Sequence, residues 1–260
     1  MESSEWSLDL YLDQPIVILL TGTMAGFGSH VMPAANMGLD RDRQAVPQLY
    51  ELLRNKIVSL QLAPGTVLSR AALAHEYGVS QTPVRDALLR LSEEKLVDVF
   101  PQASTRVSLI DITLARETHF LRRSLELEIV RELALHGDPL LIIDLQAHLK
   151  KQEILRDARN FAAFTEADMA FHHALYLAAD MEPMWKMLIS RSGHLDRLRR
   201  LHLPVIGKLE RIVKDHQRIV AAIAEKNIEK AQLALREHLS GTLEYVPQIM
   251  RDHTALIRPL

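Results

Sequence analysis

Residues 69–91, SRAALAHEYGVSQTPVRDALLRL, constrain the fold more than any other stretch of this chain. Ser69 is a favourable helix N-cap, and Gly78 follows the first apolar stripe as a helix stop. A second helix is predicted to begin near Ser80 or Thr82. Two short helices joined by so tight a turn are typical of a helix-turn-helix, in which the second helix enters the DNA major groove. An ordinary helical hairpin is the alternative.

A helix before this stretch and a hairpin after it complete the pattern. Apolar residues recur at helical spacing over 46–60. Beyond the two helices, apolar and polar residues alternate at 97–99 and again at 106–108, with a Pro-containing turn between them. Three helices followed by a short β-hairpin predict a winged helix-turn-helix domain over 44–110. The wing favours DNA binding, because a plain helical hairpin has no reason to carry one.

Composition narrows the class of protein further. The 260 residues leave room for two domains, and the absence of cysteine excludes disulfides, thiolate metal sites and thiol nucleophiles. The net charge of −2 means that DNA binding has to come from a local patch, and the aromatic content of 5% disfavours stacking on single strands. The apolar run PIVILLTGTMAGFG is too short and too rich in glycine to span a bilayer. We therefore expect a cytoplasmic protein whose nucleic-acid partner is double-stranded DNA, with no membrane partner.

The remaining segments divide by pattern. Residues 1–43 carry six acids and two arginines and are expected to be a poorly ordered extension. Residues 111–250 show helical periodicity throughout, which predicts a second, all-α domain with its own core. Residues 251–260 are expected to be a frayed tail. The helices of the second domain are predicted over 112–135, 139–157, 160–179, 183–201, 207–225 and 228–246. The expected fold is therefore mainly α, a winged helix-turn-helix domain followed by a helical bundle.

Four polar residues in the helical domain are predicted to meet. Asp168 and His172 are four apart in EADMAFHHAL, so they share one helix face. His216 and His238 lie within apolar stripes on two successive helices, with the turn residue Asn227 midway between them, so an antiparallel pair brings them level. One carboxylate and three imidazoles suit a divalent transition metal, zinc or nickel. Alternatively, each histidine is satisfied by its own hydrogen bond. Most other histidines, His119 and His202 among them, are expected to be at the surface or half-buried.

The motifs together resemble a known family. The segment LAPGTVLSRAALAHEYGVSQTPVRDALLRLSEEKLVDVFPQASTRVS is similar to the DNA-binding domain of GntR-type bacterial transcription regulators. The helical part resembles the ligand-binding domain of their FadR-like branch, called FCD, through FLRRSLELEIVREL, EADMAFHHALYLAA, KDHQRIVAAI and KAQLALREHL. These stretches cover residues 46–246. The resemblance implies a palindromic operator read by a homodimer.

The resemblance also implies roles for single residues of the helical domain. Asp168, His172, His216 and His238 match the family's metal ligands. Arg122 matches an arginine that can meet the carboxylate of an effector in bidentate fashion. His194 and Arg197 are expected to line the same pocket. Such domains usually bind small organic acids, so a small carboxylate effector anchored by the metal is expected here.

One departure from the family falls on the recognition helix. Gln81 stands where relatives commonly have arginine, and Ala71 stands where some place a charged residue. DNA contacts are therefore expected from Arg70, Gln81, Thr82 and Arg85, with Arg106 on the wing. Since glutamine can read adenine and arginine guanine, an altered operator is expected. An ion pair with a wing or inter-helix carboxylate is the alternative role for Arg85.

These observations predict a dimeric, metal-containing, ligand-responsive transcription regulator that is not an enzyme. We expect it to repress transcription and the effector to relieve that repression. Two rivals remain. A metal-dependent hydrolase with a DNA-binding-like hairpin would use three histidines and an open position to activate water, although no general base or nucleophile motif accompanies them. A purely architectural DNA-binding protein would need neither metal nor effector.

Overall fold

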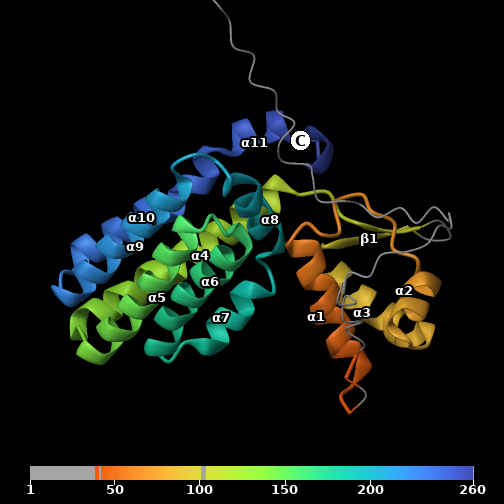
Figure 1. Ribbon diagram of the computed structural model, residues 1–260, viewed down its shortest axis with the longest axis horizontal. Helices are drawn as coiled ribbons and strands as arrows, with labels where there is room; N and C mark the ends of the chain where they lie inside the picture. The colour runs from red at the N-terminus through yellow and green to blue at the C-terminus, as the bar shows by residue number, and fades with distance from the viewer. Residues whose placement is uncertain (1–38, 41, 101–103, 260) are drawn as a thin grey trace, which may run out of the picture. The chain divides into compact units, whose positions relative to one another are not determined.

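The winged helix-turn-helix has the predicted order of elements (Figure 1). The computed structural model describes residues 39–40, 42–100 and 104–259, so the expectation for residues 1–43 falls almost wholly outside the described residues. Helices α1 (Ala45–Val58), α2 (Arg70–Tyr77) and α3 (Gln81–Glu93) precede strands β1 (Val97–Val99) and β2 (Thr105–Val107). The strands are antiparallel, with Val97 opposite Val107 and Val99 opposite Thr105. The fold class predicted from the sequence is confirmed.

Local sequence explains where α2 begins and ends. The Ser69 hydroxyl accepts a hydrogen bond from the Ala72 amide at 3.3 Å and so caps the first turn. Gly78 ends the helix in the left-handed conformation, with φ of 65°. One apolar core holds the three helices and the hairpin together, and its fully buried members include Leu49, Leu53 and Leu91.

The second domain is a bundle of helices. Five long helices pack against one another, and two short ones, α7 and α8, close one side of the bundle (Figure 1). Side-chain caps start four of the long helices, since Asp111, Asp138, Asn160 and Asn227 each accept a backbone N–H of the first turn. The bounds are α4 (Ile112–His136), α5 (Pro139–Asp157), α6 (Phe161–Ala178), α7 (Glu182–Ile189), α8 (Gly193–His202), α9 (Lys208–Ala224) and α10 (Ile228–Glu244).

Two segments differ from the sequence-based expectation. The single helix predicted over 183–201 is two helices, because a turn at 190–192 separates α7 from α8. The tail predicted over 251–260 is docked, since α11 (Val246–Asp252) and a short 3₁₀ turn (Thr254–Leu256) lead to Ile257, which is buried and bridges to Ile110 in parallel. Its apolar residues, read as a frayed end, pack into a small core of their own with residues of α4 and α8.

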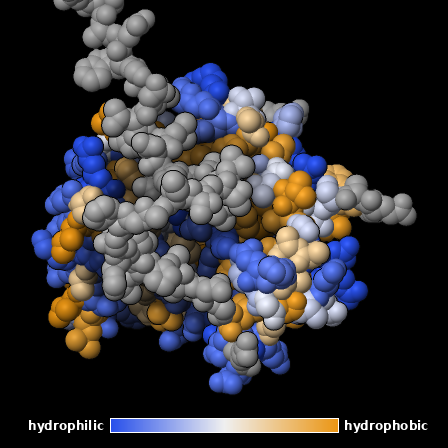
Figure 2. All heavy atoms as spheres, turned by 45° about the vertical axis from the view of Figure 1, so that its right-hand side comes forward, coloured by the Kyte–Doolittle hydropathy of each residue, from blue (hydrophilic) through white to orange (hydrophobic). Residues whose placement is uncertain are grey.

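The surface carries scattered apolar side chains. Ile206 and Leu140 are the most exposed of these among the described residues. Figure 2 shows one face of the molecule, on which hydrophobic and hydrophilic residues are interspersed. None of the described helices combines the length with the apolar composition that crossing a bilayer requires.

Candidate metal and effector site

The four predicted ligands meet inside the helical domain. Asp168 and His172 come from α6, His216 from α9 and His238 from α10, and one ligand atom of each lies within 4.8 Å of those of the others. The Nε2 atom of His238 lies 3.2 Å from that of His172 and 3.1 Å from that of His216. Three imidazole nitrogens therefore face a common point, with a carboxylate oxygen of Asp168 3.8 Å from His216 Nε2.

The far side of each imidazole faces an oxygen. His172 Nδ1 lies 2.9 Å from a carboxylate oxygen of Glu126. His216 Nδ1 lies 2.9 Å from Oε1 of Gln152, whose amide nitrogen donates to the Ala167 carbonyl at 3.3 Å, which leaves Oε1 as the acceptor. His238 Nδ1 lies 3.9 Å from a carboxylate oxygen of Asp215. The Gln152 oxygen favours a proton on Nδ1 of His216 and so turns the lone pair of its Nε2 toward the shared point.

Burial disfavours a second proton on two of the three imidazoles. Burial, followed by the neighbouring His238, holds the pKa of His216 well below its usual value, and burial lowers the pKa of His238 to about 4. Burial would raise the pKa of Asp168, but Arg199 and the three histidines outweigh it and lower that pKa. Glu126 behaves likewise, since the attraction of Arg122 and His172 lowers its pKa to about 2 against the effect of burial.

These residues fit a divalent transition metal. Three imidazole nitrogens and a carboxylate oxygen that converge on one point can hold a cation between them. Nitrogen-rich ligation with one carboxylate suits zinc or nickel, and outer oxygens on the ligating imidazoles are usual at such sites. The predicted meeting of the four residues is present in the structure, and the metal itself stays a prediction.

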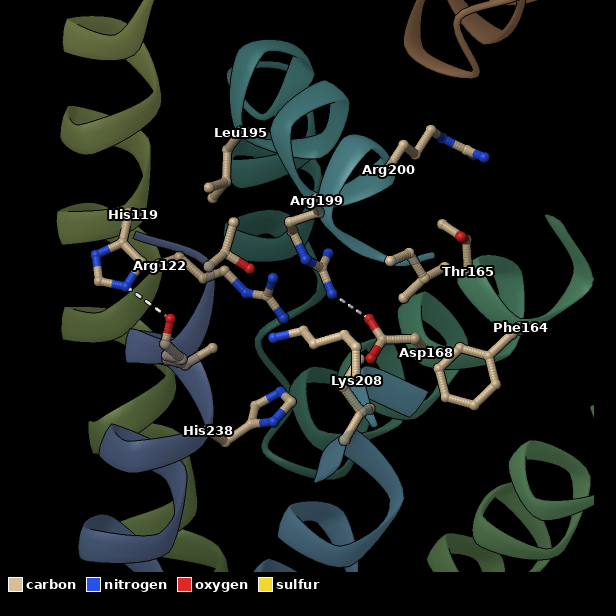
Figure 3. A pocket seen from close by; sticks show the side chains of 14 residues that line it. His119, Arg122, Phe164, Thr165, Asp168, Leu195, Arg199, Arg200, Lys208 and His238 are labelled. Carbon is tan, nitrogen blue, oxygen red and sulfur yellow. Dashed lines mark hydrogen bonds and ion pairs between the residues drawn. The ribbon is translucent and has the colours of Figure 1, made fainter. Parts of the chain in front are cut away.

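A cavity lies beside the cluster (Figure 3). Arg122 of α4 enters it with its Nε donating to Glu126 at 2.7 Å, so one side of the guanidinium is fixed and the rest is free for a ligand. Arg199 pairs with Asp168 and lies 3.6 Å from Asp196. The lining residues are His119, Arg122, Phe164, Thr165, Asp168, Leu195, Arg199, Arg200, Leu203, Lys208, Ile212, His238, Leu239 and Thr242.

His194 and Arg197 do not line this cavity, contrary to the expectation from the sequence. His194 accepts the Asp111 amide N–H at Nδ1 (2.9 Å), and its Nε2 lies 3.1 Å from the carbonyl oxygen of Lys95. Arg197 is fully buried and donates to the Ser108 carbonyl oxygen at 2.7 Å. His194 and Arg197 lie three apart and so share one face of α8, the face turned toward the winged domain. Arg199 projects from another face of the same helix, into the cavity.

The five predicted DNA-binding residues are all exposed. Gln81, Thr82 and Arg85 lie on α3, which is the second helix of the helix-turn-helix. Arg70 and Arg85 line one surface groove together with residues of the wing. Arg85 pairs only with its neighbour Asp86, at 3.2 Å, so no wing or inter-helix carboxylate among the described residues holds it. Arg106 lies on β2, where its Nε donates to Ser104 Oγ at 3.0 Å.

Sequence reasoning missed part of the site. His119 was expected to be at the surface or half-buried, yet it is buried, with Nε2 3.0 Å from the Leu239 carbonyl oxygen. Glu126 could have been found, because it follows Arg122 by one helical turn and so shares its face. Arg199, Arg200 and Lys208 lie around a break between helices, and no periodic signal in the sequence points to them.

Comparison with known proteins agrees with this architecture. Residues 46–107 match the model of bacterial regulatory proteins of the gntR family, and residues 117–241 match the FCD domain. An uncharacterized HTH-type transcriptional regulator of Streptomyces ambofaciens is 34% identical over 79% of this chain and 86% of its own length. The HTH-type transcriptional repressor RspR of Escherichia coli is 28% identical over 80% and 91%. Among solved structures, Escherichia coli McbR/YncC has a TM-score of 0.68 at 22% identity, covering 79% of this chain and 98% of that one.

Together these matches span both domains, and the relatives named are regulators and not enzymes, which removes the hydrolase reading. Regulators with this DNA-binding domain act on double-stranded operators. The chain belongs to the GntR family of bacterial transcription regulators, with a C-terminal FCD domain.

Proposed function

We propose that this chain is a homodimeric transcription repressor whose helical domain binds zinc or nickel and a small organic acid. The observation that carries the proposal concerns α8. Its residues Leu195 and Arg199 line the cavity beside the four histidine and aspartate ligands, while His194 and Arg197 contact the winged domain. A ligand that moves α8 therefore acts on both domains at once.

On the DNA side, α3 enters the major groove of each half-site of a palindromic operator. Arg70, Gln81, Thr82 and Arg85 make base and phosphate contacts, and Arg106 contacts the backbone from the wing. Their shared exposure supports this assignment. Since Gln81 offers an amide in place of a guanidinium, the operator contains an adenine where arginine would select guanine.

On the effector side, the acid's carboxylate lies between the metal site and Arg122. The bound ion supplies positive charge for the carboxylate, and Asp168, His172, His216 and His238 hold it. Arg122 adds a bidentate contact with the part of the guanidinium that Glu126 does not occupy. The low exposure of Arg122, 7%, supports a role inside the domain over a role as a solvated surface charge.

Repression is the expected activity, and effector binding relieves it. The relative RspR is named a transcriptional repressor, which supports repression over activation. The effector has to bind the DNA-free arrangement more tightly than the DNA-bound one, and by linkage the operator lowers effector affinity by the same factor.

The DNA assignment is tested by selecting binding sites from a random double-stranded pool and measuring affinity by fluorescence anisotropy. We expect Arg85→Ala to weaken operator binding by about 10- to 100-fold, because one base contact of this kind contributes roughly 1–3 kcal/mol. Arg90→Ala, five residues further along the same helix, is the matched control and leaves the affinity within threefold. Equal losses in both variants, or none in Arg85→Ala, would remove Arg85 from the groove.

The effector assignment is tested by a thermal-shift screen of small carboxylates on the metal-loaded protein. We expect hits whose shift Arg122→Gln loses, and the same compounds should release the selected operator. A protein that binds the operator but holds no metal and shifts with no carboxylate would be an architectural DNA-binding protein, and the sensing proposal would be wrong.

A further inference from the structure

We infer that the effector carries two anionic groups, and that Lys208, the first residue of α9, binds the second. This inference rests on the proposed function, since it specifies the acid that the helical domain senses. The class comprises short dicarboxylates and phosphorylated carboxylic acids, which share two anionic groups a few bonds apart.

Lys208 is a cation inside the cavity without a partner of its own. Figure 3 shows its side chain pointing into the middle of the cavity, toward the guanidinium of Arg122. Arg122 has Glu126 and Arg199 has Asp168, whereas no carboxylate of the described residues lies within ion-pairing distance of Lys208 Nζ. Burial, with repulsion from Arg199 and Arg211, lowers the pKa of Lys208 to about 8. A partly desolvated ammonium held among other cations is unfavourable unless an anion joins it.

The structure makes room for this ammonium group. Gly241 lies inside α10, where glycine destabilises a helix by roughly 0.5–1 kcal/mol relative to alanine. A Cβ atom at this position would lie 3.2 Å from Lys208 Nζ, which is closer than nearly all such contacts. The glycine therefore lets the tip of Lys208 lie against the backbone of α10, next to the cavity-lining Thr242.

The balance of charge points to a dianion. Glu126, Asp168, Asp196 and Asp215 bring four carboxylates to the site, and Arg122, Arg199, Arg200 and Lys208 bring four cations. A divalent ion among these residues then leaves two positive charges without compensation. A monocarboxylate neutralises one of them and leaves the other desolvated. Arg200 and Lys208 are the two cations of this set that have no ion-pair partner among the described residues.

The test compares matched acids on the full-length, metal-loaded protein by calorimetry. Succinate and L-malate are set against butyrate and 2-hydroxybutyrate, and 3-phosphoglycerate against glycerate. In at least one of these two comparisons, dicarboxylate or phosphorylated acid, we expect the dianion to bind at least tenfold more tightly than its matched monoanion. The arm with the larger preference tells whether the second group is a carboxylate or a phosphate.

Lys208→Met carries the decisive comparison, with Lys214→Met on the exposed face of the same helix as its control. Loss of one partner of a desolvated charge pair removes about 30-fold or more in affinity. We expect that loss for the dianion in Lys208→Met, with monoanion affinity within threefold and no change in Lys214→Met. Without ligand, Lys208→Met should unfold at a higher temperature than the wild type, because an uncompensated charge is gone. Gly241→Ala, which crowds the ammonium group while keeping its charge, should weaken dianion binding in the same direction.

The outcomes separate the two levels of the proposal. If no carboxylate of either kind binds, the proposed function is wrong. If monoanions bind as tightly as dianions, or Lys208→Met weakens both equally, the proposed function stands, while Lys208 serves the first carboxylate and the dianion inference is wrong.

Discussion

Two buried polar clusters in the helical domain both contain histidine but differ in whether each donor has an acceptor. In the cluster at the junction with the winged domain, His194 accepts an N–H at Nδ1 and faces a carbonyl oxygen at Nε2, and Arg197 donates to the carbonyl oxygen of Ser108. Each donor named here thus meets an acceptor. A single neutral tautomer of His194 satisfies both contacts, with the proton on Nε2.

The second cluster, Asp168, His172, His216 and His238, is called the ligand cluster here, and it lacks such a complete set of hydrogen bonds. Nδ1 of His216 meets Gln152 Oε1, and Nδ1 of His172 lies 2.9 Å from a Glu126 oxygen. Nε2 of His238 faces the Nε2 atoms of the other two rings at 3.1–3.2 Å. Burial holds the pKa values of His216 and His238 below their ordinary value, so neither imidazole readily takes up a second proton. Buried polarity alone therefore does not mark a binding site. The mark is a set of ring nitrogens that converge on one point without a complete set of hydrogen bonds, because a bound cation would stabilise such a set.

The largest expected effect comes from breaking the ligand cluster. We expect about one transition-metal ion per chain after purification without chelator, and a chelator should lower the free energy of unfolding by about 4 kcal/mol at a thousandfold excess of metal over its dissociation constant. His172→Gln should lose the ion by elemental analysis. His173→Gln is the matched control, since this neighbouring residue is stacked on Trp185 and lies outside the cluster. Full metal content in His172→Gln would show that this imidazole does not hold the ion, and the proposed difference between the two clusters would be wrong.

A smaller effect is expected from breaking the cluster at the junction. Arg197→Met removes the guanidinium but not the carbonyl oxygen of Ser108 that it satisfies, and the loss of one partner of such a buried contact is expected to lower the free energy of unfolding by about 3 kcal/mol. Urea unfolding measures the change, with metal content unaltered. Arg116→Met, on the exposed side of α4, should stay within about 0.5 kcal/mol. A variant as stable as the wild type would show that the junction does not depend on Arg197.

The difference between the clusters also explains what the sequence could predict. The ligand residues follow from local rules, since Asp168 and His172 share a helix face and an antiparallel pair brings His216 level with His238. Periodicity likewise predicted the winged domain and the bounds of most helices. These predictions succeed because each depends on spacing within one element or between two neighbours in sequence.

The junction could not be predicted in the same way. His194 and Arg197 meet partners about ninety positions away in the chain, and their roles depend on the break that makes α8 a separate helix. Nothing in the periodicity of 183–201 signals that break. The docked C-terminus failed for the same reason, because Ile257 is buried only through its pairing with distant Ile110. Lys208 belongs with these, since its place in the cavity depends on the turn before α9 and on the space at Gly241.

The smallest expected effect is the pH dependence of the free energy of unfolding that His194 contributes at the junction with the winged domain. Burial, together with Arg197, lowers the pKa of His194 to about 4 from an ordinary value of 6.5, so the folded protein holds this imidazole neutral. The unfolded chain binds the proton more readily, and the stabilisation is therefore fully present above pH 6.5 and is lost as the pH falls toward 4. Between pH 7 and pH 5 the loss amounts to about 2 kcal/mol. His194→Gln keeps an acceptor and a donor but cannot titrate, so its stability should fall less steeply over this range in urea unfolding. The metal cluster contributes equally to both proteins, and identical slopes would show that His194 is not held neutral at the junction.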